Sequence, residues 1–321
     1  MKREETMKTM AFPLLLPLAL MAFMGCSTPR LQPHEGYVTV PGGRVWYKVV
    51  GSGPGTPLLV LHGGPGATSH YLEPLSSLGA ERPVIFYDQL GCGRSDRPTD
   101  TNLWRTARFI EELRCVRQHL GLKRVHLLGH SWGTMLATDY LLTQPRGIES
   151  LILMSPCLSV PRFLQDLAGL RRLLPPEVQQ TLTRHEEAGT INSPEYQRAA
   201  QAFLTKFVCR LDPWPPELER ALAGFGTEVY HVMWGPSELF PTGSLKDYDR
   251  TSRLGTWRLP VLFAVGRFDE CTPEATAWYQ SLVPGSRLVV FERSSHMAML
   301  EETDRCNTVI RDFLLGVEKK E

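Results

Sequence analysis

Short, uninterrupted apolar runs recur along the chain, and this feature constrains the possible folds most strongly. Strands that are buried on both faces of a parallel sheet show such runs instead of an alternating pattern. Two earlier segments, residues 37–40 and 44–50, do alternate and are joined by a Pro-Gly-Gly turn, as in a hairpin. The segments that contain the continuous runs are residues 57–64, 83–91, 125–131, 150–156, 260–270 and 287–296, and the last two end in polar and charged residues.

Segments with helical periodicity separate most of these runs. Apolar residues recur at helical spacing in residues 104–120, 132–142, 273–282 and 302–315. Alternating strands and helices predict an α/β fold with a mostly parallel central sheet and helices on both faces. A chain of 321 residues, 42% of them hydrophobic, is long enough for one such domain.

The alternation stops between residues 158 and 256. This stretch contains helical segments such as 197–207, several prolines and no convincing buried strand. We therefore predict an α/β core over residues 37–157 and 257–316, with residues 158–256 forming a helical cap. Because ligands bind at the carboxyl edge of open α/β sheets, we expect the cap to lie over that edge.

The first thirty residues differ in composition from the rest of the chain. Residues 10–24 form an apolar run of about 15 residues, shorter than the ~20 that a transmembrane helix needs. This length suits the central region of a secretory signal peptide, which we predict over residues 1–25. A plain cleaved signal and an uncleaved anchor are alternatives, and Met7 is an alternative start.

The signal ends in Phe-Met-Gly-Cys-Ser-Thr, which resembles a bacterial lipobox. The resemblance implies lipidation at Cys26, with residues 26–36 as a linker. The expected location is then the cell envelope, anchored to the membrane by lipid. Ser27 favours the periplasmic side of the outer membrane if the cell has one.

Charge and cysteine content exclude other classes of function. With 35 basic and 34 acidic residues the net charge is +1, so we expect no nucleic-acid partner. The cysteines other than Cys26 show neither CxxC nor zinc-site spacing, and we expect most to be free and buried. No GxGxxG lies where a dinucleotide would need it. We therefore expect no metal and no cofactor.

Residues 127–134, Leu-Leu-Gly-His-Ser-Trp-Gly-Thr, place Ser131 between Gly129 and Gly133. A buried strand precedes this pattern and a helix follows it, which is the context of a strained turn that exposes a nucleophilic serine. The glycines avoid clashes across so tight a turn. Without that context, the same pentapeptide indicates only a glycine-containing loop.

Asp269 lies just past the apolar residues 261–266, and His296 lies just past residues 287–294. The order Ser131, Asp269, His296 fits a catalytic triad on this architecture. In the expected mechanism His296 takes the proton of Ser131 and later protonates the leaving group, while Asp269 orients the imidazole. The alternatives are a helix cap for Asp269 and a surface position for His296. For the oxyanion hole we predict the backbone amides of Gly64, in the sequence His-Gly-Gly-Pro-Gly, and Trp132.

Four segments together resemble the proline iminopeptidase family of α/β-hydrolases, which includes related amino-acid amidases. They are HGGPG (62–66), YDQLGCGRS (87–95), GHSWG (129–133) and GPSELFPTGSLKDYDR (235–250). The resemblance covers residues 37–315 and implies a serine aminopeptidase that releases N-terminal proline, or another small apolar residue, from short peptides or amides. An esterase or amidase with the same triad is the nearest alternative, and a non-catalytic envelope lipoprotein is a further one.

A protonated amine in a closed site needs carboxylate partners, because its desolvation is otherwise not recovered. Glu270, next to Asp269, and Glu238, in the cap, are the candidates, and the family resemblance implies the same positions. Family members often carry phenylalanine directly after the cap glutamate, where this chain has Leu239 and then Phe240. The predicted pocket walls are Tyr230, Trp234 and Phe240.

The segment 87–95 also carries charged and thiol side chains. We expect Asp88 and Arg94 to brace the loop beside the oxyanion region, and Cys92 to be a packing residue.

Overall fold

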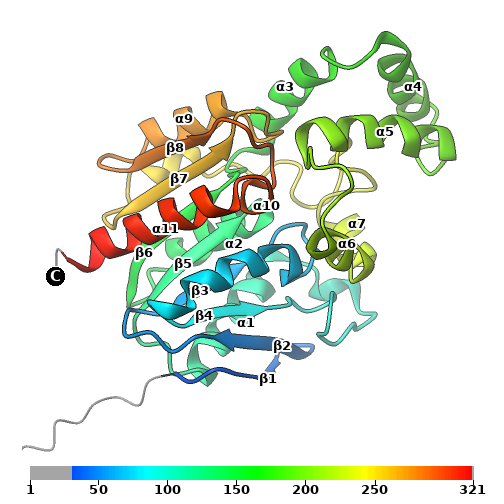
Figure 1. Ribbon diagram of the computed structural model, residues 1–321. Coiled ribbons are helices and arrows are strands. Elements are labelled where there is room, and N and C mark those ends of the chain that lie inside the picture. The colour runs from blue at the N-terminus through cyan, green and yellow to red at the C-terminus, as the bar shows by residue number, and fades with distance from the viewer. Residues whose placement is uncertain (1–30, 320–321) are drawn as a thin grey trace, which may run out of the picture. The chain divides into compact units, whose positions relative to one another are not determined.

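A computed structural model of the chain describes residues 31–319, and Figure 1 shows their arrangement. The predicted signal peptide and Cys26 lie outside the described residues. The described chain is built on an eight-stranded sheet with the order β1-β2-β4-β3-β5-β6-β7-β8. The strands are β1 (His34–Val40), β2 (Gly43–Val50), β3 (Leu58–Leu61), β4 (Val84–Tyr87), β5 (Val125–His130), β6 (Ile148–Met154), β7 (Val261–Gly266) and β8 (Arg287–Phe291).

Strand direction divides the sheet into two parts. β1 pairs with β2 and β2 with β4 in antiparallel fashion, whereas the pairs from β4 through β3 to β8 are parallel. In the parallel part Leu61, the last residue of β3, lies opposite Gly129 near the end of β5. This register places the loop after β3 beside the turn that carries Ser131.

The two faces of the sheet are covered by different helices. Leu127 belongs to the core that contains α1 (Thr106–His119), α2 (Trp132–Leu142) and α9 (Pro273–Ser281). The next residue, Leu128, belongs to the core on the other face, with the 3-10 helix η1 (Ser69–Ala80), α10 (Ala298–Glu301) and α11 (Thr303–Glu318). Because successive strand residues point to opposite faces, burial on both sides explains the uninterrupted apolar runs.

The edges of the sheet differ from the sequence expectation. β1 begins at His34, inside the segment expected to be a linker, because His34 pairs with Val49 of β2. β8 is only partly buried over Arg287–Val290, since it is an edge strand with a single neighbour. η1 lies outside the segments for which helices were predicted, and its sequence contains Pro74 together with serines and a glycine.

Between β6 and β7 the chain forms helices and no strand, within the residues that the structure describes. In Figure 1, the green and yellow helices α3 to α7 gather beside one end of the sheet. The helices between β6 and β7 are α3 (Val160–Arg171), α4 (Pro176–Glu187), α5 (Pro194–Phe207), α6 (Pro216–Ala223), α7 (Thr227–Met233) and α8 (Thr251–Leu254). We refer to this insertion as the cap.

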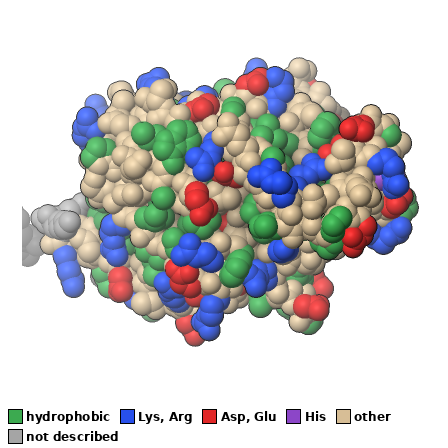
Figure 2. All heavy atoms as spheres, turned by 90° about the horizontal axis from the view of Figure 1, so that it is seen from above, with side chains coloured by type: hydrophobic (Ala, Val, Ile, Leu, Met, Phe, Trp, Pro, Cys, Tyr) green, Lys and Arg blue, Asp and Glu red, His purple; other side chains and the backbone are tan. Residues whose placement is uncertain are grey.

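The surface carries charges of both signs. On the face shown in Figure 2, basic and acidic side chains are interspersed and hydrophobic ones are scattered between them. Among the described helices, none combines the length and the apolar character that crossing a membrane requires. The cysteines of the described residues are free, and all except Cys115 are buried.

Candidate active site

Ser131 occupies a strained backbone conformation between β5 and α2. Its φ of 54° and ψ of −124° lie in a region that residues with a side chain rarely adopt. The flanking glycines make this turn possible. A Cβ at Gly129 would lie 2.3 Å from the carbonyl oxygen of Gly133, and one at Gly133 would lie 2.1 Å from that of Leu61. Both contacts are with backbone, so neither position has room for a side chain.

Asp269 and His296 form the hydrogen-bonded acid–base pair beside this turn. Asp269 lies between β7 and α9, His296 lies in the loop after β8, and His296 Nδ1 is 2.7 Å from Asp269 Oδ1. Both side chains are buried, with 1% and 3% of their surface exposed. Burial by itself lowers the pKa of His296, but the Asp269 carboxylate raises it, and the net pKa lies above the ordinary value. This pairing stabilises a positively charged imidazole.

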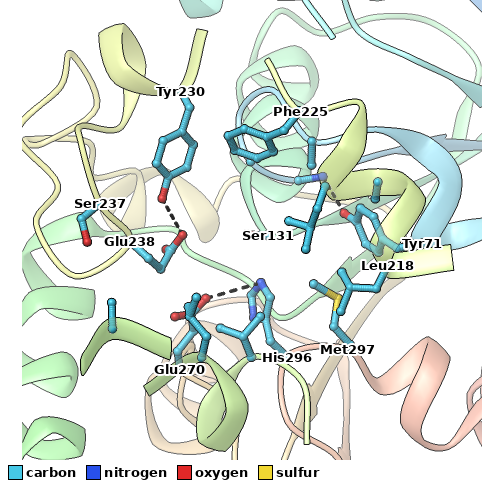
Figure 3. Close-up of a pocket in the computed structure, with 18 of the residues that line it drawn as sticks. Tyr71, Ser131, Leu218, Phe225, Tyr230, Ser237, Glu238, Glu270, His296 and Met297 are labelled. Atoms are coloured by element: carbon cyan, nitrogen blue, oxygen red, sulfur yellow. Dashed lines mark hydrogen bonds and ion pairs between the residues drawn. The ribbon is translucent and has the colours of Figure 1, made fainter. Parts of the chain in front are cut away.

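Ser131 and His296 line the same cavity, and Figure 3 shows their side chains next to each other. None of the hydrogen bonds among residues 31–319 joins Ser131 Oγ to His296; the ring is instead 3.8 Å, through Nε2, from Glu270 Oε1. Catalytic hydrogen bonds are often long before substrate binds. The structure therefore brings the three predicted triad residues together, with the serine–histidine bond not formed.

The predicted oxyanion donors are backbone amides on either side of Ser131. Gly64 and Trp132 have no acceptor for their N–H groups within the described part of the chain, whereas the N–H of Gly63 donates to Tyr71 Oη at 2.7 Å. Gly64, with φ of 109°, and Trp132, at the start of α2, therefore offer the free donors. The indole of Trp132 does not reach toward substrate, because its Nε1 donates to Gln89 Oε1 at 2.9 Å.

A buried network that the sequence analysis missed joins these two regions. Tyr71 Oη accepts from the Gly63 amide and lies 2.8 Å from His130 Nδ1, and His130 Nε2 lies 2.9 Å from the carbonyl oxygen of His296. A carbonyl only accepts, so Nε2 carries the proton and Nδ1 accepts from the tyrosine hydroxyl. Burial holds the pKa of His130 well below its ordinary value, so the ring is neutral. The network thus connects the loop after β3 to the backbone of His296.

Glu238 and Glu270 line the same cavity and lie near each other in Figure 3, the first coming from the cap and the second from the loop after β7. Burial raises the pKa of Glu270 well above its ordinary value, and the neighbouring carboxylates Glu238 and Asp269 raise it further. Burial also raises the pKa of Glu238, although a hydrogen bond of 2.7 Å from Tyr230 Oη opposes this. Glu270 Oε2 has no hydrogen-bond partner within residues 31–319. A buried acid with an unused oxygen, next to a second acid that is partly buried, forms an environment that favours a cation.

The cavity has a volume of about 360 Å³ and lies between the sheet edge and the cap. Tyr230 lines it. Trp234 lines a separate, smaller cavity that shares Ser131, Glu238 and Glu270 with it, and Trp234 Nε1 lies 3.4 Å from the Glu238 carbonyl oxygen. The prediction for Phe240 is wrong. A turn, in which the Phe240 amide donates to the Ser237 carbonyl, leaves Phe240 38% exposed and directs Leu239 into the cavity instead.

Asp88 and Arg94 brace the loop beside the oxyanion region. Asp88 accepts from Arg94 Nε at 3.0 Å and, through its other oxygen, from the Ser69 amide at 2.9 Å. Arg94 also stacks over Trp46, with 3.1 Å from its guanidinium carbon to the ring centre. Cys92, between these residues in sequence, is fully buried.

One group of potential metal ligands, not apparent from sequence spacing, lies at the triad. Single ligand atoms of Asp269, Cys271 and His296 lie within 4.8 Å of one another. The carboxylate and imidazole of this group are already bonded to each other. A hydrogen bond with Cys157, together with burial, raises the pKa of the Cys271 thiol well above its ordinary value, which disfavours the thiolate that a metal requires.

Known proteins match both the sequence and the geometry. A family model for the alpha/beta hydrolase fold matches residues 56–303. The chain is 50% identical to a proline iminopeptidase of Heyndrickxia coagulans over 285 residues, which cover 88% of this chain and 99% of that protein.

Solved structures agree with this relationship. The crystal structure of VinJ superposes with a TM-score of 0.85 and 36% identity, covering 90% of this chain and 100% of that one. A proline iminopeptidase of Mycobacterium smegmatis superposes with a TM-score of 0.83 and 34% identity, covering 89% of this chain and 99% of that one. The chain therefore belongs to the proline iminopeptidase family of α/β-hydrolases.

Proposed function

We propose that the protein is a serine aminopeptidase that releases N-terminal proline from short peptides or amides through an acyl-enzyme. One observation carries the proposal: two carboxylates, the buried Glu270 and the partly buried Glu238, line the cavity that contains Ser131 and His296. The triad alone is compatible with any acyl transfer, whereas the carboxylates specify a free amine next to the scissile carbonyl.

The reaction proceeds in two balanced halves. His296 Nε2 accepts the proton of Ser131 as Oγ bonds to the substrate carbonyl carbon, and the amides of Gly64 and Trp132 stabilise the oxyanion. The carbon–nitrogen bond then breaks, and His296 gives its proton to the leaving nitrogen. Water attacks the acyl-enzyme with His296 again as base, which frees the amino acid and restores the serine.

The acid pair explains why the enzyme would act only at a free N-terminus. A protonated amine placed between the carboxylates replaces its lost hydration with charge-assisted hydrogen bonds and uses the free Oε2 of Glu270. A blocked amine carries no charge, so it would leave both carboxylates without a counter-ion. Proline, rather than another residue, is supported by the names of the relatives from Heyndrickxia coagulans and Mycobacterium smegmatis.

A panel of chromogenic substrates tests this proposal. Proline 4-nitroanilide should be cleaved faster than alanine 4-nitroanilide, and N-acetylproline 4-nitroanilide and a simple ester should be poor substrates. Ser131→Ala should abolish turnover while circular dichroism and the unfolding midpoint show a folded protein. Persistent turnover in that variant, or faster cleavage of the N-acetylated substrate than of the free amine, would refute the proposal.

We further propose that the protein is exported and lipidated at Cys26. The support comes from the charged start, the apolar run and the Phe-Met-Gly-Cys-Ser-Thr segment. Labelling cells with a radioactive fatty acid should mark the wild-type protein and leave Cys26→Ala unlabelled. An unlabelled wild-type protein would rule out the lipid anchor and leave a cleaved signal or an uncleaved anchor.

A further inference from the structure

The active-site cavity has two chemically different ends. In Figure 3, Glu238 and Glu270 lie on one side of Ser131 and His296, and Leu218 and Met297 lie on the other. α6, which carries Leu218, also contributes Ala221 and Leu222 to the cavity lining. Val208, whose carbonyl oxygen accepts from the Met297 amide at 3.1 Å, lines the cavity as well. Among the described residues that line the cavity, the only carboxylates are Glu238 and Glu270, and there is no lysine or arginine.

The reaction fixes the direction in which a substrate lies across this cavity. On the proposed function, the free amine sits at Glu238 and Glu270 and the carbonyl carbon at Ser131. The leaving nitrogen must lie where His296 can protonate it, which is on the far side of the carbonyl carbon from the amine. Whatever is attached to that nitrogen therefore extends toward Leu218 and Met297.

The apolar end is too large to be explained by the N-terminal residue. The cavity volume of about 360 Å³ falls within the range of about 300–1,000 Å³ typical of pockets that hold whole small-molecule ligands. A single proline ring at the acid end leaves the space around α6 unfilled. Water finds few hydrogen-bond partners in a space lined by apolar side chains, so an apolar group of the substrate is bound there favourably.

We infer that this end is a subsite for a bulky, uncharged, apolar leaving group. The preferred substrates are then N-terminal prolyl amides and peptides whose second residue is large and apolar. A charged second residue is disfavoured, and so is the free carboxylate of a dipeptide, because burying either charge at this end meets no counter-charge. This inference rests on the proposed function and adds to it the class of the leaving group.

Four amides that differ only in the second residue test the inference: Pro-Phe-NH₂, Pro-Gly-NH₂, Pro-Lys-NH₂ and Pro-Asp-NH₂, assayed by release of free proline. Burying a phenylalanine side chain should raise kcat/KM at least about tenfold over the glycine amide. The lysine and aspartate amides should fall below the glycine amide. Equal kcat/KM for the four amides would overturn the inference.

A substitution at the rim of the cavity tests the location of the subsite. Leu222, in α6, lines the cavity and yet is 48% exposed, so an aspartate there can remain hydrated. In Leu222→Asp the ratio of kcat/KM for Pro-Phe-NH₂ to that for Pro-Lys-NH₂ should fall about fivefold, because an apolar contact is lost and a counter-charge is gained. Leu173→Asp is the matched control, since Leu173 is 59% exposed in the cap but does not line the cavity.

Each outcome bears on one proposal. An unchanged ratio in Leu222→Asp would overturn the subsite, provided that its circular dichroism matches that of Leu173→Asp. If Leu222→Asp does not fold, Ala221→Phe fills the same end and should lower the preference for phenylalanine over glycine; an unchanged preference would again overturn the subsite. Failure to release proline from any substrate would refute the proposed function, whereas release without dependence on the second residue would refute only this inference.

Discussion

Tyr71 is the residue whose removal tests the buried network most directly. Its hydroxyl accepts from the Gly63 amide at 2.7 Å and lies 2.8 Å from His130 Nδ1, and both partners are buried. Tyr71→Phe removes one oxygen atom and leaves the ring, which packs edge-on against His130 with 5.2 Å between ring centres. The substitution therefore isolates the hydrogen bonds from the packing.

The expected loss follows from the two groups that are left without a partner. A buried donor or acceptor that loses its partner costs about 1–3 kcal/mol. Tyr71→Phe strands the Gly63 N–H and His130 Nδ1, so the free energy of unfolding should fall by about 2–6 kcal/mol. Because Gly63 precedes Gly64, the predicted oxyanion donor, and His130 Nε2 bonds to the carbonyl oxygen of His296, kcat should also fall, on the order of 10-fold to 100-fold.

Urea unfolding, together with the kinetics of proline 4-nitroanilide cleavage, measures both effects. Tyr87→Phe is a matched control, because the Tyr87 side chain is fully buried but its hydroxyl has no hydrogen-bond partner within residues 31–319. Removing that hydroxyl should leave stability unchanged or raise it, and kcat should not change. Equal losses of stability in the two variants would refute the role assigned to the network.

Further measurements test the electrostatics and the turn. The kcat/KM for proline 4-nitroanilide should fall on acidification with a midpoint above pH 6.5, since His296 must be neutral to accept a proton and its pKa is raised; a midpoint below 6.5 would contradict this. Glu270→Gln should reduce kcat/KM more for free-amine substrates than for N-blocked or ester ones, and equal reductions would argue against amine binding there. Because the pKa of Glu270 is raised in the folded protein, its carboxyl group lowers the free energy of unfolding at pH values above its ordinary pKa of 4.5 and has no such effect below that pH. Glu270→Gln should therefore be more stable than wild type at pH 8 but not at pH 4. Gly133→Ala should lower the free energy of unfolding by about 3 kcal/mol or more, whereas Gly316→Ala, in α11 with open space around its Cβ position, should raise it slightly; similar effects at both positions would contradict the steric argument.

The sequence predicts best those features that many residues encode together. The parallel strands other than β8 are marked by runs of buried residues, because neighbours such as Leu127 and Leu128 pack into different cores. Chain order and strand ends then bring Ser131, Asp269 and His296 to one edge of the sheet, because parallel strands end on the same side. The acids Glu238 and Glu270 could be proposed from chemistry and family resemblance.

Features that depend on a single local turn could not be predicted. Whether Leu239 or Phe240 faces the cavity is decided by one turn, and both residues are equally apolar in sequence. Tyr71 lies in a 3-10 helix whose serines, glycine and Pro74 indicate a loop. The role of His130 depends on that tyrosine and on a carbonyl group 166 residues away. No periodic signal in the sequence connects these partners.

The glycines of the nucleophile turn have a consequence for how this enzyme can diversify. The distance between Ser131 and the oxyanion loop is set by direct backbone contact, with Gly133 lying against the carbonyl of Leu61. Because this contact is between backbone atoms, there is no side chain in it that mutation could trim, and a Cβ added at Gly133 would clash with the backbone. The cap, by contrast, enters between β6 and β7 as one contiguous insertion. Substitutions in α6 can therefore change which leaving group is accepted while the geometry of bond cleavage stays fixed.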